Sequence, residues 1–230
     1  MNNKPRIIIA ADNMEPLALI QLMRRVGRNI HAVKINDAFD HYGPIIVRQL
    51  KDVTERVWVD VKLHDIPNTV KNRAATLDGI GADIITVHAL GGMEMMVAAV
   101  EGARGGAKIY AVTVLTSHDQ RYVSNMFECT IDHLVLKLAA MASDSGVQGI
   151  VCSPKELLLI KEYRRFEHLD LVTPGVRSVG ADVGDQKRVD TPRAAISAGA
   201  NYIVVGRQIT EAPDPVAALE AIEAEIADVS

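Results

Sequence analysis

Short apolar segments rich in branched residues alternate with amphipathic segments along the whole chain. The short segments show no polar face, which is typical of strands that are buried on both sides, whereas the segments between them repeat apolar residues with a helical period. The expected strands are residues 6–11, 31–35, 57–62, 83–89, 108–115, 149–153, 170–175 and 201–206. The expected helices are residues 15–26, 42–52, 67–80, 92–103, 131–146, 154–166, 191–200 and 214–229.

Eight strand–helix units within 230 residues predict an α/β fold, the (β/α)8 TIM barrel. A doubly wound open sheet is the alternative. It usually has fewer units, and no glycine-rich G-x-G-x-x-G turn follows the first strand here. No linker or change in composition divides the sequence, so we expect a single barrel domain over residues 1–230.

Two connections are too long for simple turns, namely residues 116–129 after the fifth strand and residues 173–190 after the seventh. Connections of this length inside a compact domain are usually lids or binding loops, or else disordered. Both follow strands, so in a barrel both lie at the carboxyl-terminal face, where barrel active sites lie.

The composition excludes several classes of protein. A chain that is 48% apolar and 23% charged is an ordinary globular protein, and its longest apolar runs are far shorter than a membrane span. With no signal segment at its start, it is expected to be cytoplasmic. A net charge of -4 and 4% aromatic residues argue against nucleic-acid binding. Cys129 and Cys152 lack metal-site spacing, so we expect two reduced thiols without a chemical role.

Charged residues interrupt three consecutive apolar strands near their carboxyl ends. Asp60 and Lys62 lie on the same face of the third strand as Trp58, because side chains alternate along a strand. A single pair of this kind is as often structural as functional, and Asp12 after the first strand could simply cap the next helix. Lys34 inside the second strand, however, needs a solvated or paired environment. Together these residues predict an alternating charged cluster at the barrel mouth.

Two further polar residues allow alternative interpretations. Asp65 precedes Pro67, which suits the first turn of a helix, so Asp65 is a candidate N-cap. His88 ends the fourth strand with no second histidine or cysteine at metal-ligand spacing. We expect His88 to be a hydrogen-bonded residue of the site wall or core rather than a metal ligand.

The opposite side of the barrel offers a phosphate site. Gly206 and Arg207 end the eighth strand, and loops after the seventh and eighth strands bind phosphate in many barrels. Arginine grips phosphate with two parallel hydrogen bonds. A Gly-Arg pair also occurs by chance, but Arg177 and Gln186 on the long seventh connection add a second cation and an amide that could close over the same ligand.

The chain resembles the orotidine 5′-monophosphate decarboxylase family. The segment DVKLHDIPNT matches the pattern D-x-K-x-x-D-I-P-N-T at every fixed position. The likeness extends over essentially the whole chain through the segments AAD, VKI, VTVLTS, TPGVR, DQKRV and VVGRQIT.

The resemblance implies the conversion of orotidine 5′-monophosphate to uridine 5′-monophosphate, the final step of de novo pyrimidine synthesis, without a metal or cofactor. It implies that Lys34, Asp60, Lys62 and Asp65 form the charged network and that Lys62 is the proton donor. Asp12 and Lys34 would bind the ribose hydroxyls. Asp65 would enter the active site of a partner subunit, which implies a homodimer with shared sites.

The resemblance also implies how the nucleotide is held. Thr116 would contact the pyrimidine, Gln186 would bridge pyrimidine and phosphate, and Arg207 would grip the phosphate. Ile66 would reach the partner's site together with its neighbour Asp65. The implied substrate-binding residues are Asp12, Lys34, Ile66, Thr69, Thr116, Pro174, Arg177, Gln186, Gly206 and Arg207.

This chemistry explains a lysine among carboxylates at a strand end. Loss of CO2 from C6 of the pyrimidine leaves a carbanion that no carbonyl is placed to delocalise, so a cation fixed beside that carbon is needed. Lys62 would stabilise the charge and then protonate C6. Asp60 would hold Lys62 in position, and the sequence leaves open whether it also destabilises the substrate carboxylate.

Three other functions compete with this one. The nearest is a magnesium-dependent sugar-phosphate decarboxylase or aldolase with the same D-x-K-x-x-D scaffold, against which Thr116, Gln186 and the complete DIPNT segment argue. In the second, Lys62 forms a Schiff base, as in some barrel aldolases. The third is an inactive barrel that binds a phosphorylated metabolite or acts as a scaffold, which would not need the Asp60–Lys62 pair.

Overall fold

Eight parallel strands form a closed barrel in the order of the sequence, and β8 pairs with β1. The structure is a computed structural model that describes residues 6–178, 188 and 190–229. The predicted (β/α)8 fold is therefore confirmed. The strands are β1 (Ile7–Ala10), β2 (Ala32–Ile35), β3 (Val57–Leu63), β4 (Ile84–His88), β5 (Lys108–Val112), β6 (Gly149–Val151), β7 (Asp170–Thr173) and β8 (Tyr202–Val205).

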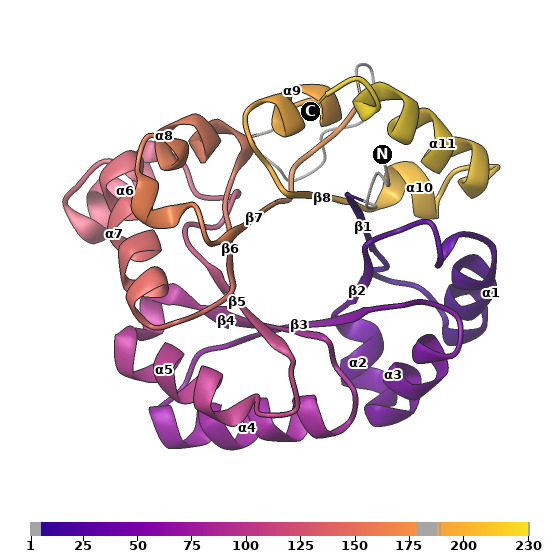
Figure 1. Cartoon of the computed structure of the whole chain (residues 1–230), viewed down its shortest axis with the longest axis horizontal. Helices are drawn as coiled ribbons and strands as arrows, with labels where there is room; N and C mark the ends of the chain where they lie inside the picture. Colours follow the sequence, from indigo (N-terminus) through magenta and orange to yellow (C-terminus); the bar gives the residue numbers. More distant parts are fainter. Residues whose placement is uncertain (1–5, 179–187, 189, 230) are drawn as a thin grey trace.

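Helices surround the barrel as an outer ring, and no strand edge is left open (Figure 1). In the described part of the chain, no helix is long and apolar enough to cross a membrane. The α-helices are α1 (Pro16–Val26), α2 (Asp37–Tyr42), α3 (Pro44–Lys51), α4 (Pro67–Gly79), α5 (Met93–Gly102), α6 (Gln120–Phe127), α7 (Ile131–Asp144), α8 (Leu157–Lys161), α9 (Pro192–Ser197), α10 (Arg207–Thr210) and α11 (Pro215–Ile226). Short 3-10 turns are η1 (Ala89–Gly91), η2 (Pro154–Glu156) and η3 (Arg164–Phe166).

Several segments differ from the sequence prediction, which included neither the short helix α10 nor the turn η1. The helix expected over residues 42–52 is α3, preceded by an unpredicted α2, and Gly43 with φ of 57° separates the two. The connection over residues 116–129 is not simply a lid, because it contains α6, whose first turn is capped by the carboxylate of Asp119. The helix expected over residues 154–166 is divided into η2, α8 and η3.

Two apolar layers hold the barrel together. The larger lies between the strands and the helices, and the smaller fills the barrel interior around Trp58 and Tyr110. Their rings meet edge to face at 5.7 Å, and Nε1 of Trp58 donates a hydrogen bond to Oγ1 of Thr86 at 2.6 Å. Gly149 makes room for this packing, since a Cβ there would lie 2.8 Å from the Tyr110 ring. The barrel is thus filled at its centre and open only beyond the strand ends.

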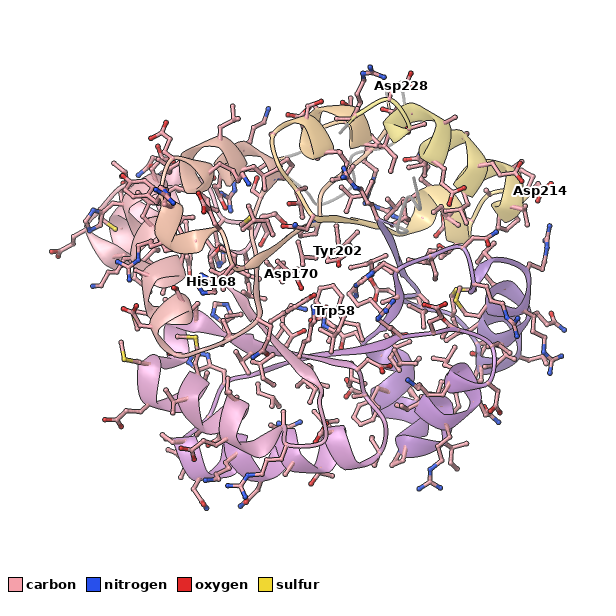
Figure 2. The ribbon with its side chains drawn as sticks, in the orientation of Figure 1. Trp58, His168, Asp170, Tyr202, Asp214 and Asp228 are labelled. Carbon is pink, nitrogen blue, oxygen red and sulfur yellow. The ribbon has the colours of Figure 1, made fainter. Side chains whose placement is uncertain are left out.

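Polar side chains form a layer at the amino-terminal end of the barrel, where Figure 2 shows Asp170 and Tyr202 projecting into the ring of strands. The carboxylate of Asp170 accepts hydrogen bonds from Lys108 and from the hydroxyl of Tyr110, each at 2.7 Å. His31 stacks on Tyr202 with ring centroids 3.7 Å apart. Because His31 is buried in this layer, it affects how the stability of the protein depends on pH.

The consequence is a pH dependence of folding. Burial and the neighbouring Arg56 lower the pKa of His31 from 6.5 to about 4. Below pH 6.5 the unfolded chain binds a proton at this residue and the folded protein does not, so stability falls as pH falls toward 4. The loss from one such group approaches ~1.4 kcal/mol per pH unit.

The His31→Phe variant retains a stacking ring but cannot titrate. Between about pH 7.5 and pH 5, wild type should lose roughly 1 to 2 kcal/mol more unfolding free energy than this variant. Urea unfolding at both pH values measures the loss of unfolding free energy in each protein. Subtracting the loss of the variant from that of wild type removes the contribution of the other histidines, which both proteins share. An equal loss in the two proteins would mean that His31 titrates normally in the folded state.

Candidate active site

A cavity of about 580 Å³ opens at the carboxyl ends of the strands. Trp58 forms part of its wall, with Val112 and Val204 from the interior layer. The cavity is large enough for a small organic ligand and is the place where ligands bind in barrels of this kind. Of the predicted site residues, those that line it are Asp12, Lys34, Asp60, Lys62, Thr116, Pro174, Arg177, Gly206 and Arg207.

Four of these side chains form a row of alternating charges across β1, β2 and β3. Nζ of Lys34 lies 2.9 Å from Oδ1 of Asp12 and 3.3 Å from Oδ2 of Asp60. Nζ of Lys62 donates to the same Oδ2 of Asp60 at 2.9 Å. The predicted cluster is therefore present, and Asp12 does not cap the next helix, since the N-cap of α1 is Glu15.

Register between the strands explains why these residues meet. Lys34 of β2 is paired with Ala10 of β1 on one side and with Trp58 of β3 on the other. Asp12 lies two residues beyond Ala10 and Asp60 two residues beyond Trp58, so each carboxylate reaches Lys34 from a neighbouring strand end. The Asp12–Lys34–Asp60 part of the row is thus a product of the parallel sheet, whereas Asp60 and Lys62 lie two residues apart on β3.

The charges in the row stabilise one another. Lys34 is 7% exposed and Asp60 6%. Each buried charge therefore needs the opposite charge of the other to offset its loss of hydration. Burial alone would lower the pKa of Lys34, but the carboxylates of Asp60 and Asp12 outweigh it and raise that pKa. Burial would likewise raise the pKa of Asp60, and the Lys34 and Lys62 ammonium groups reverse the shift. Lys34 is thus held as a cation and Asp60 as an anion.

The backbone of Lys62 is in an unusual conformation. Its φ is 43°, in the left-handed region that residues with a side chain rarely adopt. The pairing of β3 with β4 also shifts here, because Val59 is opposite Ile85 whereas Leu63 is opposite Val87. Three residues of β3 therefore bulge between paired positions and present Asp60 and Lys62 to the cavity. Such strain is typical of functional sites.

Asp65, Ile66 and Thr69 lie outside the cavity that the described residues of this chain enclose. The predicted network of four residues is therefore not assembled within this chain, because Asp65 is exposed and makes no ion pair with Lys62. Asp65 is not the N-cap of α4 either. That position is Ile66, whose N–H donates to Oδ1 of Asp65 at 2.7 Å, and the Ile66 side chain is 67% exposed.

The predicted phosphate residues line the same cavity, and those of β8 lie beside the Asp12 end of the charge row, because β8 pairs with β1. Pro174 and Arg177 reach the cavity from the segment after β7, and Gly206 and Arg207 from the end of β8. A Cβ at Gly206 would lie 3.4 Å from the carbonyl oxygen of Ala10, so packing alone does not require glycine there. Gln186 lies outside the described residues, as does most of the connection expected over residues 173–190.

Several residues of the cavity wall were not identified from the sequence. Asn13 and Asn36 follow the strands of Asp12 and Lys34, and Ser117 and Glu211 also line the cavity. Their sequence context does not distinguish them, because each is a polar residue just past a strand or short helix, as is common in any loop. Asn13 alone has a further mark, a φ of 57°, and that is visible only in the structure.

Cys152 was predicted to have no chemical role, and His88 to be a hydrogen-bonded residue of the site wall or core. Cys152 lies at the cavity wall, but burial raises the pKa of its thiol to about 12, so it is not a thiolate nucleophile near neutral pH. His88 accepts a hydrogen bond from the N–H of Leu90 at 3.4 Å and does not line the cavity. Across the described ranges, no three His, Cys, Asp or Glu side chains form a group suited to a metal ion.

Comparison with known proteins identifies relatives over the full length of the barrel. The curated orotidine 5′-phosphate decarboxylase of Pseudoalteromonas atlantica is 40% identical over 97% of this chain and 99% of its own. That of Moorella thermoacetica is 42% identical over 98% of this chain and 94% of its own. The crystal structure of orotidine 5′-phosphate decarboxylase from Lactobacillus acidophilus has a TM-score of 0.82, with 35% identity over 97% of this chain and 99% of that one.

The family model described as "Orotidine 5'-phosphate decarboxylase / HUMPS family" matches residues 5–222, a span that includes all eight strands and every wall of the cavity. The chain belongs to the orotidine 5′-phosphate decarboxylase / HUMPS family.

Proposed function

We propose that the row Asp12–Lys34–Asp60–Lys62 is the catalytic centre of an orotidine 5′-phosphate decarboxylase. The reaction is the loss of CO2 from orotidine 5′-monophosphate to give uridine 5′-monophosphate, the final step of pyrimidine nucleotide synthesis. The observation that supports the residue assignment is the Lys62 ammonium group, held 2.9 Å from a buried carboxylate at the wall of the cavity.

Lys62 would act on the reacting carbon. When the C6 carboxylate leaves as CO2, its bonding electron pair stays on C6, and a nearby ammonium group lowers the energy of that carbanion. The same ammonium then donates a proton to C6, which completes uridine 5′-monophosphate and leaves Lys62 neutral until it takes a proton from water. No electron acceptor is needed, because the reaction exchanges CO2 for a proton.

Asp60 would fix the position of Lys62 before the substrate arrives. Its Oδ2 is shared by the ammonium groups of Lys34 and Lys62, at 3.3 and 2.9 Å. Its Oδ1 is buried and accepts no hydrogen bond from any described residue. The charged Asp60 side chain lines the cavity, so a substrate carboxylate bound beside it would be destabilised relative to the transition state, in which the charge has moved to C6.

The remaining walls of the cavity suit a nucleotide. Asp12 and Lys34 offer an acceptor and a donor for ribose hydroxyls, and Thr116 offers a hydroxyl for the pyrimidine edge. Arg207 at the end of β8 and Arg177 after β7 provide positive charge at the cavity wall for the phosphate. Binding energy from that remote phosphate can then contribute to the reaction at C6.

The competing functions fit this geometry less well. In a magnesium-dependent sister enzyme, carboxylates of the strand ends would bind the metal, yet Nζ of Lys34 occupies the space between Asp12 and Asp60. In a Schiff-base aldolase, the reactive lysine must be neutral to attack a carbonyl. Lys62 is instead ion-paired with the buried carboxylate of Asp60, an arrangement that suits a proton donor.

We further infer that the enzyme is a cytoplasmic homodimer whose sites are completed by the partner. Asp65 and Ile66 lie at the surface of this chain. His64 stacks on His88 at 5.5 Å, which joins this segment to the one after β4, where Leu90 and Met93 are 40% and 43% exposed. Large exposed apolar residues near one another favour a protein interface.

Removal of the Lys62 ammonium group is the direct test of the mechanism. Lys62→Ala should lower kcat by about a hundredfold or more, because the lost interaction acts mainly in the transition state. The variant should still bind uridine 5′-monophosphate, measured by calorimetry. Lys71→Ala is the matched control, since Lys71 is an exposed lysine paired with Glu101, and it should be fully active. A Lys62→Ala enzyme with about a tenth of wild-type kcat would refute the assigned role.

Mixing inactive variants tests the shared site. Lys62→Ala and Asp65→Ala homodimers should each be inactive, but random exchange of subunits should restore about a quarter of wild-type activity, because a mixed dimer has one intact site. Lys62→Ala mixed with Asp60→Ala is the control, since both defects lie in the row of the same chain and no intact site can form. Absence of recovery, with exchange verified by mass spectrometry, would place Asp65 outside the partner's site.

A further inference from the structure

Arg188 lies outside the cavity wall and has no role in the chemistry above, yet its side chain is only 11% exposed. Its guanidinium group points toward the loops that follow β5 and β6. One terminal nitrogen, Nη2, donates hydrogen bonds to the carbonyl oxygens of Val114 at 3.1 Å and Leu115 at 2.9 Å. The other, Nη1, is paired with the carboxylate of Glu156.

Glu156 is itself fixed in place. Its side chain is 2% exposed, and its Oε2 accepts a hydrogen bond from the N–H of Ser153 at 2.9 Å, within a capping box at the start of η2. A carboxylate buried to this degree requires a charged partner. Arg188 therefore has a rigid anchor in the segment after β6, from which it reaches the segment after β5.

The backbone around Arg188 is held as well. Oγ of Ser153 donates to the carbonyl oxygen of Arg188 at 3.3 Å. Two residues later, the carbonyl oxygen of Asp190 accepts from the N–H of Arg177 at 3.0 Å, and Val176 and Asp190 form a parallel bridge. The segments after β5, β6 and β7 thus meet at one buried arginine.

Val114 and Leu115 immediately precede Thr116, and all three residues line the cavity. The hydrogen bonds from Arg188 fix two consecutive carbonyl groups, which sets the direction in which the chain enters Thr116. We propose that Arg188 is a positioning residue that orients Thr116 toward the pyrimidine ring of the substrate. This inference rests on the proposed function, because the role of Thr116 toward the base is part of that proposal.

The chemistry of the guanidinium group suits this task. Its planar array of five N–H donors can satisfy a carboxylate on one side and two carbonyl groups on the other at once. A lysine ammonium group at the end of a flexible stem can replace the charge beside Glu156 but not this fixed arrangement. Arg188→Lys therefore separates the two contributions, because it keeps the buried ion pair while loosening the carbonyl contacts.

The test is a double-mutant cycle on kcat/KM for orotidine 5′-monophosphate, with Arg188→Lys, Thr116→Ala and the two changes combined. Each single change should lower kcat/KM by about three- to tenfold, the effect of one hydrogen bond. If Arg188 acts through Thr116, the double variant should be no worse than Thr116→Ala alone, to within about twofold. Arg165→Ala is the control, since Arg165 forms an exposed ion pair with Asp144 elsewhere on the barrel.

Two further measurements distinguish positioning from general destabilisation. Arg188→Lys should weaken inhibition by uridine 5′-monophosphate but leave inhibition by ribose 5-phosphate unchanged, because the latter lacks the base. Hydrogen exchange at the amides of residues 115–117 should be faster than in wild type, and this measurement does not depend on activity. If wild type fails to turn over orotidine 5′-monophosphate, the proposed function is wrong, and exchange alone then decides whether Arg188 orders the segment.

Three results would overturn the proposal. The first is a double variant whose fold loss in kcat/KM equals the product of the two single losses, which would show that Arg188 acts independently of Thr116. The second is an equal weakening of uridine 5′-monophosphate and ribose 5-phosphate. The third is unchanged hydrogen exchange at residues 115–117 in the folded variant.

Discussion

The site depends on the burial of Lys34 between two carboxylates. A cation that is 7% exposed inside an apolar strand would be costly on its own, and the attraction of Asp12 and Asp60 makes it possible. Once Lys34 is in place, Asp60 can remain charged in a buried position, and Asp60 in turn fixes Lys62. The reactive ammonium group is therefore positioned by a chain of ion pairs that begins at Asp12, two strands away.

The closed parallel barrel makes this row possible. Neighbouring strands end side by side at one face, so residues 12, 34 and 60 meet although they are far apart in the sequence. The bulge in β3, with Lys62 at φ of 43°, then directs the last member of the row into the cavity. Fold and chemistry are linked here, because the register of the parallel strands brings these residues together at one face.

Much of the fold and part of the site could be predicted from the sequence, for identifiable reasons. The strands were found because buried parallel strands lack a polar face, and Lys34 and Asp60 were found because they break that pattern. The helix α6 was missed because its short segment lacks a long apolar repeat. Arg188 was missed because its partners Glu156 and Val114 are distant in sequence. The structure of a single chain does not place Asp65 in an active site, because its proposed site belongs to a partner subunit.

The central claim is that fixed charges of the protein alone promote decarboxylation. The most direct measurement is the decrease in absorbance of orotidine 5′-monophosphate on addition of purified protein, with and without EDTA. Rapid conversion to uridine 5′-monophosphate is expected, at the same rate in both samples. Activity that disappears with EDTA and returns with magnesium, or a substrate that is not consumed at all, would contradict it.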